Sequence, residues 1–276
     1  MKPQSVSEQM MYNTVRISTE SGCGTGSFFN FKVDGYVVPV IITNQHVINY
    51  NENELTTFEV HIKDSEEEST TNLKVAYSTK WIFHNDKDIC FCYANPLFEE
   101  IRRIHHKEVF YIANDESLIY SKDKLEELSV LEELVMVGYP IGLWDSRNNF
   151  PIFRKGYTSS HPAIDFNEDG IGLIDMACLP GSSGSPIYIL NEGGYTDKNG
   201  NTYSGQSRLI LIGFLVSGPQ YTADGELIVK NISTKQTVGT STKIMANLGY
   251  YIKANEILKF RSQIIGDLKS ENTIEI

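Results

Sequence analysis

The sequence predicts an all-β protein, and three observations lead to this fold class. Short β-branched or aromatic runs recur along the chain, separated by turn residues. Little helical periodicity lies between these runs, so the strands are expected to form a barrel or a sandwich and not a βαβ unit. The 15 Tyr, 13 Phe and 21 Gly among 276 residues are typical of a chain rich in strands and turns.

Each expected strand is an apolar run bounded by turn chemistry. The first follows the turn signal Asp34-Gly35. The expected strands are residues 36–42, 73–77, 88–93, 134–137, 172–176, 186–190 and 209–216. The acidic segment 123–133 is interpreted as a connection between two halves. Residues 191–207, rich in Gly, Asn and Thr, are expected to form a long exposed hairpin.

Two segments carry helical periodicity instead. Residues 96–106 place Leu97, Ile101 and Ile104 at the spacing of one helix face, near the middle of the chain. Residues 255–268 repeat apolar side chains at the same spacing near the C-terminus. The sequence therefore predicts a short helix between strands and a C-terminal helix.

Charge and hydropathy exclude some partners. The net charge of −11 argues against a nucleic-acid binder, which would present a basic patch, and the group Arg102, Arg103 and Lys107 is too small to be one. No apolar run approaches the ~20 residues of a membrane helix, so no membrane partner is expected. The first eight residues lack a secretory pattern, which favours a cytoplasmic protein, with a secreted mature form as the alternative.

The four cysteines show no spacing typical of metal ligands. Cys90 and Cys92 would share one face of a strand, because alternate residues point the same way. Without a second pair or a neighbouring histidine, burial in the core is favoured over metal binding. No metal is therefore expected, and Cys23 and Cys178 stand apart from any cluster.

The segment Gly181-Ser182-Ser183-Gly184-Ser185-Pro186 is the strongest chemical signal in the chain. Its glycines permit a tight bend that exposes the hydroxyl of Ser183. The N–H groups of Gly181 and Ser183 can then converge on a developing oxyanion. Taken by itself, however, such a Gly/Ser/Pro string is also typical of an ordinary turn.

A histidine and an aspartate each stand beside an apolar strand in the first half of the chain. His46 follows the run that ends at Ile42, in the position of a general base at the rim of a barrel. Asp88 immediately precedes an apolar run, where it could be screened from water and hold the imidazole. Asp86 is the competing candidate for the same role.

These motifs occur in the order His–Asp–Ser, and in combination the sequence resembles the chymotrypsin-like serine peptidases of the bacterial trypsin-like branch. The segments that carry the resemblance are GCGTGSFF (22–29), ITNQHVI (42–48), DKDICF (86–91), VGYPIGL (137–143) and GSSGSP (181–186). TNQHV and GSSGSP are most similar to the staphylococcal glutamyl-endopeptidase group, and the Gly-Tyr-Pro-x-Gly segment also resembles HtrA-type proteases. The resemblance extends from about residue 10 to residue 265.

The resemblance implies a fold of two six-stranded antiparallel β-barrels followed by a C-terminal helix. In this arrangement residues 1–110 supply His46 and Asp88, residues 111–254 supply Ser183 and the specificity pocket, and residues 255–276 form the helix and tail. It further implies a serine endopeptidase that acts on a protein or peptide, with a His46–Asp88–Ser183 triad, an oxyanion hole from Gly181 and Ser183, and no cofactor.

Departures from the family pattern narrow the expected specificity. Ser182 stands where zymogen-type members carry an aspartate that pairs with a newly cut N-terminus, so activation by that ion pair is not expected. Ala177, six residues before Ser183, offers no carboxylate to a basic P1 side chain, and Leu215 replaces the histidine of the glutamate-specific group. The expected pocket is neutral and is lined by Ala177, Cys178, Leu215, Val216, Ser217 and Gly218.

Three other interpretations stay open at this point. The chain could be a catalytically silent protease-like binding module, or an enzyme held inactive until a protein partner orders the loop 180–183. A β-rich scaffold in which the motifs arose by chance belongs to a different class. Covalent labelling of a serine separates an active enzyme from a silent module or a scaffold.

Overall fold

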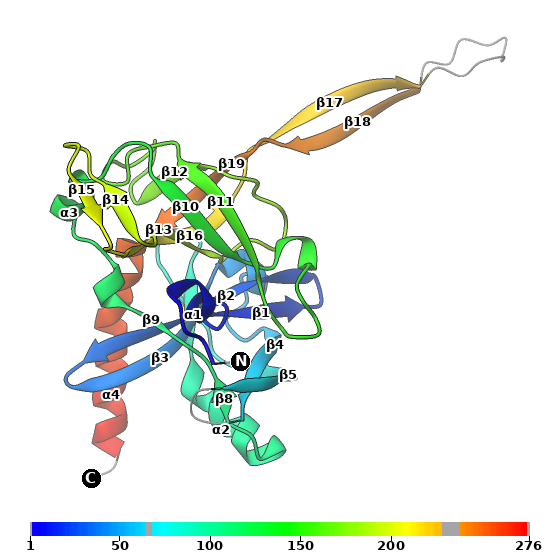
Figure 1. Ribbon diagram of the computed structural model, residues 1–276. Helices are drawn as coiled ribbons and strands as arrows, with labels where there is room; N and C mark the ends of the chain where they lie inside the picture. The colour runs from blue at the N-terminus through cyan, green and yellow to red at the C-terminus, as the bar shows by residue number, and fades with distance from the viewer. Residues whose placement is uncertain (1, 65–67, 228–237, 275–276) are drawn as a thin grey trace.

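The computed structural model describes residues 2–64, 68–227 and 238–274, and β-structure dominates both halves of the chain (Figure 1). The elements of the first half are α1 (Val6–Met10), β1 (Thr14–Thr19), β2 (Gly22–Val33), β3 (Tyr36–Thr43), η1 (Gln45–Ile48), β4 (Leu55–Lys63), β5 (Ser69–Ser78), β6 (Ile82–Phe83), β7 (Cys90–Tyr93), α2 (Ala94–His105), β8 (Val109–Phe110) and β9 (Asn114–Asp115).

The second half begins with short helical turns and ends in the long C-terminal helix. Its elements are η2 (Glu116–Leu118), α3 (Lys122–Glu126), β10 (Glu133–Gly138), η3 (Pro140–Gly142), β11 (Ile152–Thr158), β12 (Ile171–Asp175), β13 (Pro186–Asn191), β14 (Gly194–Thr196), β15 (Thr202–Ser204), β16 (Arg208–Ser217), β17 (Gln220–Leu227), β18 (Val238–Met245), β19 (Leu248–Lys253), η4 (Ala254–Phe260) and α4 (Arg261–Ile274).

The strands of the second half form a closed antiparallel barrel in the order β10-β11-β12-β19-β16-β13. The expected long hairpin is present as the pair β14–β15. A second hairpin, β17–β18, extends far from the barrel (Figure 1). The prediction of a six-stranded barrel is thus confirmed for this half.

The first half forms a large sheet instead of the expected closed barrel. Its hydrogen-bonded order is β5-β4-β1-β2-β3-β7-β6, with β8 on β4 and β9 on β2, and in the described residues β5 and β6 do not pair. All pairs are antiparallel except β2–β9. Since β6 spans only residues 82 and 83, it offers too short a ladder to close the sheet against β5.

The two predicted helices are present. α2 begins two residues before its expected start and buries Leu97 and Ile101, whereas Ile104 is 51% exposed. The C-terminal segment begins as the 3₁₀ turn η4 and continues as α4. The predicted turn at Asp34-Gly35 has positive φ at both residues (49° and 84°), as a two-residue hairpin turn requires.

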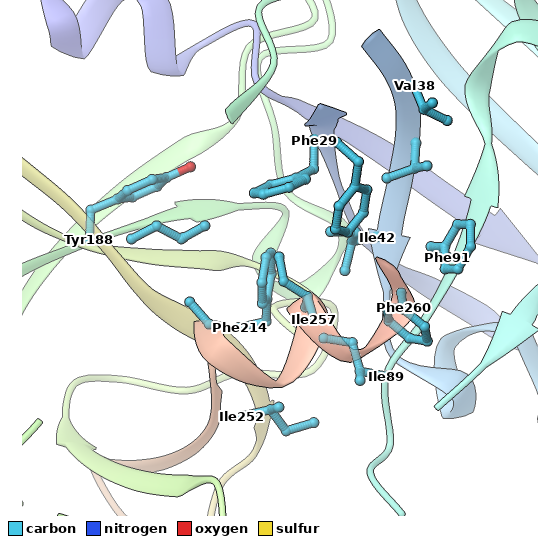
Figure 2. Packing of buried hydrophobic residues seen from close by; sticks show 14 of the residues in the cluster. Phe29, Val38, Ile42, Ile89, Phe91, Tyr188, Phe214, Ile252, Ile257 and Phe260 are labelled. Atoms are coloured by element: carbon cyan, nitrogen blue, oxygen red, sulfur yellow. The ribbon is translucent and has the colours of Figure 1, made fainter. Parts of the chain in front are cut away.

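A hydrophobic core joins the two halves of the molecule. It packs Phe29 and Ile42 of the first sheet against Tyr188 and Phe214 of the barrel, with Ile257 of η4 completing the layer (Figure 2). These side chains are fully buried. Because interiors are close-packed, this core fixes how the ends of β3 and β13 face each other.

Candidate active site

His46 and Asp88 meet where two neighbouring strands end. β3 pairs with β7 through Thr43 and Cys90, so the residues after β3 and before β7 lie at the same edge of the sheet. The Asp88 carboxylate accepts from the His46 ring, with 2.6 Å between Oδ2 and Nδ1. Its other oxygen, Oδ1, accepts the His46 backbone N–H at 3.0 Å. An ionised carboxylate can only accept, so Nδ1 donates and Nε2 keeps the lone pair that a general base needs.

The loop that carries Asp88 is held by the residues just before His46. The Gln45 side chain donates through Nε2 to the carbonyls of His84, Lys87 and Ile89 at 2.9, 3.0 and 3.2 Å. The Asn44 side chain donates to the carbonyl of Asp88 at 2.7 Å. Asn44 and Gln45 therefore position the aspartate loop, a role that the sequence alone did not indicate.

His84 closes the same loop from within. Its Nδ1 accepts the N–H groups of Asp86 and Lys87, both at 3.1 Å. Burial lowers the pKa of His84, which keeps this nitrogen available as an acceptor. The carboxylate of the competing candidate, Asp86, is exposed and makes no hydrogen bond to His46 in the described residues, so the geometry favours Asp88.

The loop of Ser183 requires glycine at two positions. Gly181 and Gly184 have φ values of +84° and +81°, in the left-handed region. A Cβ at Gly181 would lie 2.5 Å from the Tyr139 carbonyl oxygen, and one at Gly184 would lie 2.1 Å from the Thr25 carbonyl oxygen. The loop is thus pressed against both halves of the molecule.

Hydrogen bonding in this loop leaves two N–H groups without a protein partner. The N–H groups of Ser182, Gly184 and Ser185 donate to the carbonyls of residues 179, 215 and 182 at 3.0, 2.9 and 3.0 Å. The N–H groups of Gly181 and Ser183 have no acceptor within the described part of the chain. These are the two donors that the sequence motif predicted for an oxyanion.

Backbone contacts place the loop of Ser183 beside the strand that leads to His46. Thr25 donates its N–H to the Ser183 carbonyl at 2.9 Å, and Thr43 donates its hydroxyl to the Thr25 carbonyl at 2.8 Å. Thr43 is the last residue of β3, three positions before His46. Ser183 is half-buried, and its hydroxyl makes no hydrogen bond to His46 among the described residues.

A neutral pocket of about 200 Å³ lies beside Ser183. Five of the six expected pocket residues line it, and Ala177, which is exposed, does not. The lining residues are Cys178, Leu179, Pro180, Ser183, Leu215, Val216, Ser217 and Gly218. Burial raises the pKa of Cys178 to about 11, so its thiol is neutral at physiological pH.

A second cavity of about 330 Å³ shares Val216 and Ser217 with this pocket. A β-bulge between Leu215 and Ser217 lies at the junction of the two, where the pairing of β16 with β19 shifts register. The wall of the second cavity also includes Asp88. The two cavities therefore adjoin along β16, one beside Ser183 and the other beside the aspartate loop.

Arg154 on β11 contacts the residue before Ser183. Its Nη2 donates to the hydroxyl of Ser182 at 3.1 Å. Its Nη1 is buried without a hydrogen-bond partner in the described residues, and burial lowers the pKa of the guanidinium. The sequence offered no signal for this contact, because 28 residues separate the two positions.

The four cysteines are free thiols, and Cys90 and Cys92 pack side by side in the core of the first sheet, as predicted. Over the ranges that the structure describes, no three His, Cys, Asp or Glu side chains are grouped as metal ligands would be. Among these same residues, no helix is long and apolar enough to span a membrane.

We compared the chain with protein families, curated proteins and solved structures. No protein-family model matches the chain. No curated protein matches it either. Among solved structures, the chain is similar to the thermostable serine protease AL20 from an extremophilic microorganism, with 11% identity, a TM-score of 0.42, and 90% of this chain and 92% of that chain covered. It is also similar to the scabies mite inactivated protease paralogue S-I1, with 11% identity, a TM-score of 0.42, and coverage of 94% and 96%.

Proposed function

We propose that this chain is a serine endopeptidase in which Ser183 is the nucleophile, His46 the general base and Asp88 the residue that orients the imidazole. The observation that carries the proposal is the pair of N–H groups, on Gly181 and Ser183, that have no acceptor among the described residues, whereas the other three N–H groups of residues 181–185 are bonded. Buried N–H groups in proteins are nearly always paired. Gly181 is buried and Ser183 is half-buried. Two free N–H groups there, one on the proposed nucleophile and one two residues before it, support an oxyanion as their ligand.

The mechanism follows from these positions. Ser183 Oγ attacks the peptide carbonyl while His46 Nε2 takes the hydroxyl proton, and the N–H groups of Gly181 and Ser183 bind the tetrahedral oxyanion. The C–N bond then breaks, and His46 returns the proton to the leaving amine. Water, deprotonated by His46, attacks the acyl ester. The bond from the acyl carbon to Ser183 Oγ breaks, His46 returns the proton to Oγ, and the acid leaves. Asp88 stabilises the imidazolium formed in each half of the reaction.

The substrate in this proposal is a protein or peptide with an uncharged, modest-sized P1 side chain. The pocket beside Ser183 has no charged residue in its lining, which supports a neutral preference. The larger cavity, which shares Val216 and Ser217 with this pocket, would hold residues before the scissile bond. We propose further that the first sheet is the counterpart of a first barrel, and that the protein acts in the cytoplasm.

A catalytically silent binding module is the second candidate. The observation in its favour is that no hydrogen bond joins Ser183 to His46 in the described residues. Catalytic hydrogen bonds are often long before substrate binds, so we place the enzyme first. An enzyme that requires a protein partner to align Ser183 would share the same observation.

Labelling with a fluorophosphonate probe tests the proposal. The probe reacts with a serine only where a base and an oxyanion hole are assembled. We expect one label, on Ser183 by peptide mapping, and none on Ser183→Ala or on heat-denatured protein. A folded sample that takes no label would favour the silent module, unless an added partner restores labelling.

A further inference from the structure

Thr25, on β2 of the first sheet, binds the loop of Ser183 on the opposite half of the molecule. Its hydroxyl donates to the carbonyl of Gly181 at 3.1 Å, and its backbone N–H donates to the carbonyl of Ser183 at 2.9 Å. One residue thus holds the carbonyls of both residues whose N–H groups face the proposed oxyanion. The contact spans 156 positions in the sequence.

The hydrogen-bonding capacity of the Thr25 hydroxyl is fully used. Besides donating to Gly181, it accepts the N–H of Tyr139 and the hydroxyl of Ser185, both at 3.2 Å. A hydroxyl has one donor and two acceptor sites, so this set is complete. Thr25, Tyr139 and Ser185 are fully buried, so bulk water does not replace a lost bond at this point.

These bonds determine the direction of the two free N–H groups. The N–H of Ser183 belongs to the peptide that lies between the two carbonyls bound by Thr25. The N–H of Gly181 belongs to the peptide whose carbonyl, on Pro180, accepts the N–H of Ile141. A trans peptide points its C=O and N–H in opposite directions, so the Ile141 bond to the Pro180 carbonyl fixes the direction of the Gly181 N–H. The Ser183 N–H is fixed by the bond from the Ser185 N–H to the Ser182 carbonyl, and Thr25 holds the peptides on both sides of that one.

The segment that holds the Pro180 carbonyl is attached to Thr25 too. Ile141 lies two residues after Tyr139, whose N–H the Thr25 hydroxyl accepts. Both sides of the oxyanion hole are therefore anchored at Thr25, through its hydroxyl and its backbone N–H. Thr25 does not line the pocket beside Ser183, and in the described part of the chain its side chain makes no hydrogen bond to His46 or Asp88.

We propose that Thr25 is a positioning residue that holds the oxyanion hole through its hydroxyl, an inference that rests on the proposed peptidase function. It acts through the Gly181 and Ser183 peptides and does not contact substrate. Substitution should therefore lower the rate of acylation and leave ground-state binding of the substrate unchanged.

Thr25→Val is the informative variant, because it keeps the branched shape and removes the hydroxyl. It leaves the Gly181 carbonyl, the Tyr139 N–H and the Ser185 hydroxyl without their partner. We expect kcat to fall ~10- to 100-fold, less than the loss of an oxyanion donor itself, with KM within about 3-fold of wild type. Affinity for a peptide boronate, which forms a tetrahedral adduct on the serine, should fall in parallel with kcat. Thr25→Ser, which retains the hydroxyl, should restore both.

Thr158→Val is the matched control. Thr158 is 1% exposed, and its hydroxyl accepts the N–H of Glu132 at 2.8 Å and donates to the Val130 carbonyl, away from the loop of Ser183. Thr158→Val should lose about as much free energy of unfolding as Thr25→Val and should keep the wild-type kcat. Each variant is assayed at least ~15 °C below its own Tm, and Thr25→Ala replaces Thr25→Val if the latter does not fold.

The outcomes separate this inference from the proposed function. If the fluorophosphonate probe labels Ser183 at the same rate in wild type and in Thr25→Val, the positioning role is overturned and the proposed peptidase function stands. The positioning role is likewise overturned if Thr158→Val loses as much activity as Thr25→Val. Wild type that takes no fluorophosphonate label overturns the proposed function, and the positioning role with it.

Discussion

Both carboxylate oxygens of Asp88 bind a single residue, His46. Oδ2 lies 2.6 Å from the ring nitrogen Nδ1, and Oδ1 accepts the backbone N–H at 3.0 Å. The first bond sets the tautomer of the ring, and the second fixes the backbone from which the ring projects. Asp88 therefore controls the position and the protonation of the proposed base together, and at 26% exposure of its side chain it does so without being fully buried.

Asp88→Asn should abolish most of the activity. An amide would donate to Nδ1 and so place the ring proton on Nε2, where the lone pair is needed. We expect kcat to fall about 10⁴-fold with a small change in KM, measured on a cleaved peptide. Asp86→Asn is the control and should stay within about 3-fold of wild type, because Asp86 makes no bond to the ring. Equal losses in both variants would contradict the assignment of Asp88.

Gln45→Ala should disturb the aspartate loop from outside the triad. The variant leaves the carbonyls of His84, Lys87 and Ile89 without their shared donor. We expect a loss of about 1–3 kcal/mol in the free energy of unfolding, measured in urea, together with a lower kcat. A variant that keeps wild-type stability and kcat would show that these carbonyls find other partners.

Gly184→Ala should be far more damaging than Gly35→Ala, although the two glycines share nearly the same φ, +81° and +84°. A Cβ at Gly184 would lie 2.1 Å from a backbone oxygen, whereas nothing lies within 4 Å of one at Gly35. Gly35→Ala should cost only the left-handed conformation, about 1–2 kcal/mol. Gly184→Ala adds a backbone clash, so we expect a loss above about 3 kcal/mol or failure to fold. Thermal unfolding of both variants checks this; similar Tm values would mean that the Ser183 loop moves freely.

The sequence predicted the parts of this site that depend on local pattern. His46 and Asp88 each adjoin an apolar strand, and β-branched periodicity located those strands. The Ser183 loop was predicted from its glycines, whose unusual backbone angles restrict the residue type. Each of these signals lies within a few consecutive residues.

The remaining contacts depend on tertiary packing, which leaves no local pattern. Thr25 and Arg154 reach the Ser183 loop from distant strands. The segment 22–29 that contains Thr25 carries part of the family resemblance, but neither segment indicates a contact with the Ser183 loop. The open first sheet depends on the short β6 and on the added strands β8 and β9, which are too brief to detect by periodicity. Ala177 is exposed and does not line the pocket, although spacing alone had placed it there.

The neutral pocket predicts which peptides are cleaved. A P1 library should show preference for uncharged, modest-sized side chains, since the lining near Leu215 and Cys178 carries no charge to pair with Arg, Lys or Glu. Measured as kcat/KM, charged P1 residues should be at least about 10-fold poorer. A preference for Arg or Glu would mean that a charged group outside this lining reaches the P1 side chain.

The burial of His61 leads us to expect that the folded protein loses stability in mild acid. It lies in the core of the first half, 4% exposed, with its ring 4.7 Å from that of Tyr12 and 5.5 Å from that of Phe150. Burial lowers its pKa from 6.5 to about 4. Between these values the unfolded chain binds a proton that the folded chain does not, so stability falls as pH decreases from about 6.5 to 4.

The difference in pKa corresponds to about 3 kcal/mol of stability at neutral pH that is lost by pH 4. Urea unfolding at pH 7.5 and pH 5 should therefore show a larger drop for wild type than for His61→Phe, which keeps an aromatic ring and removes the titration. His84, whose pKa burial also lowers, titrates in both proteins and cancels in the comparison. Parallel pH profiles would show that His61 is protonated in the folded chain, and that its aromatic surroundings do not exclude the charge.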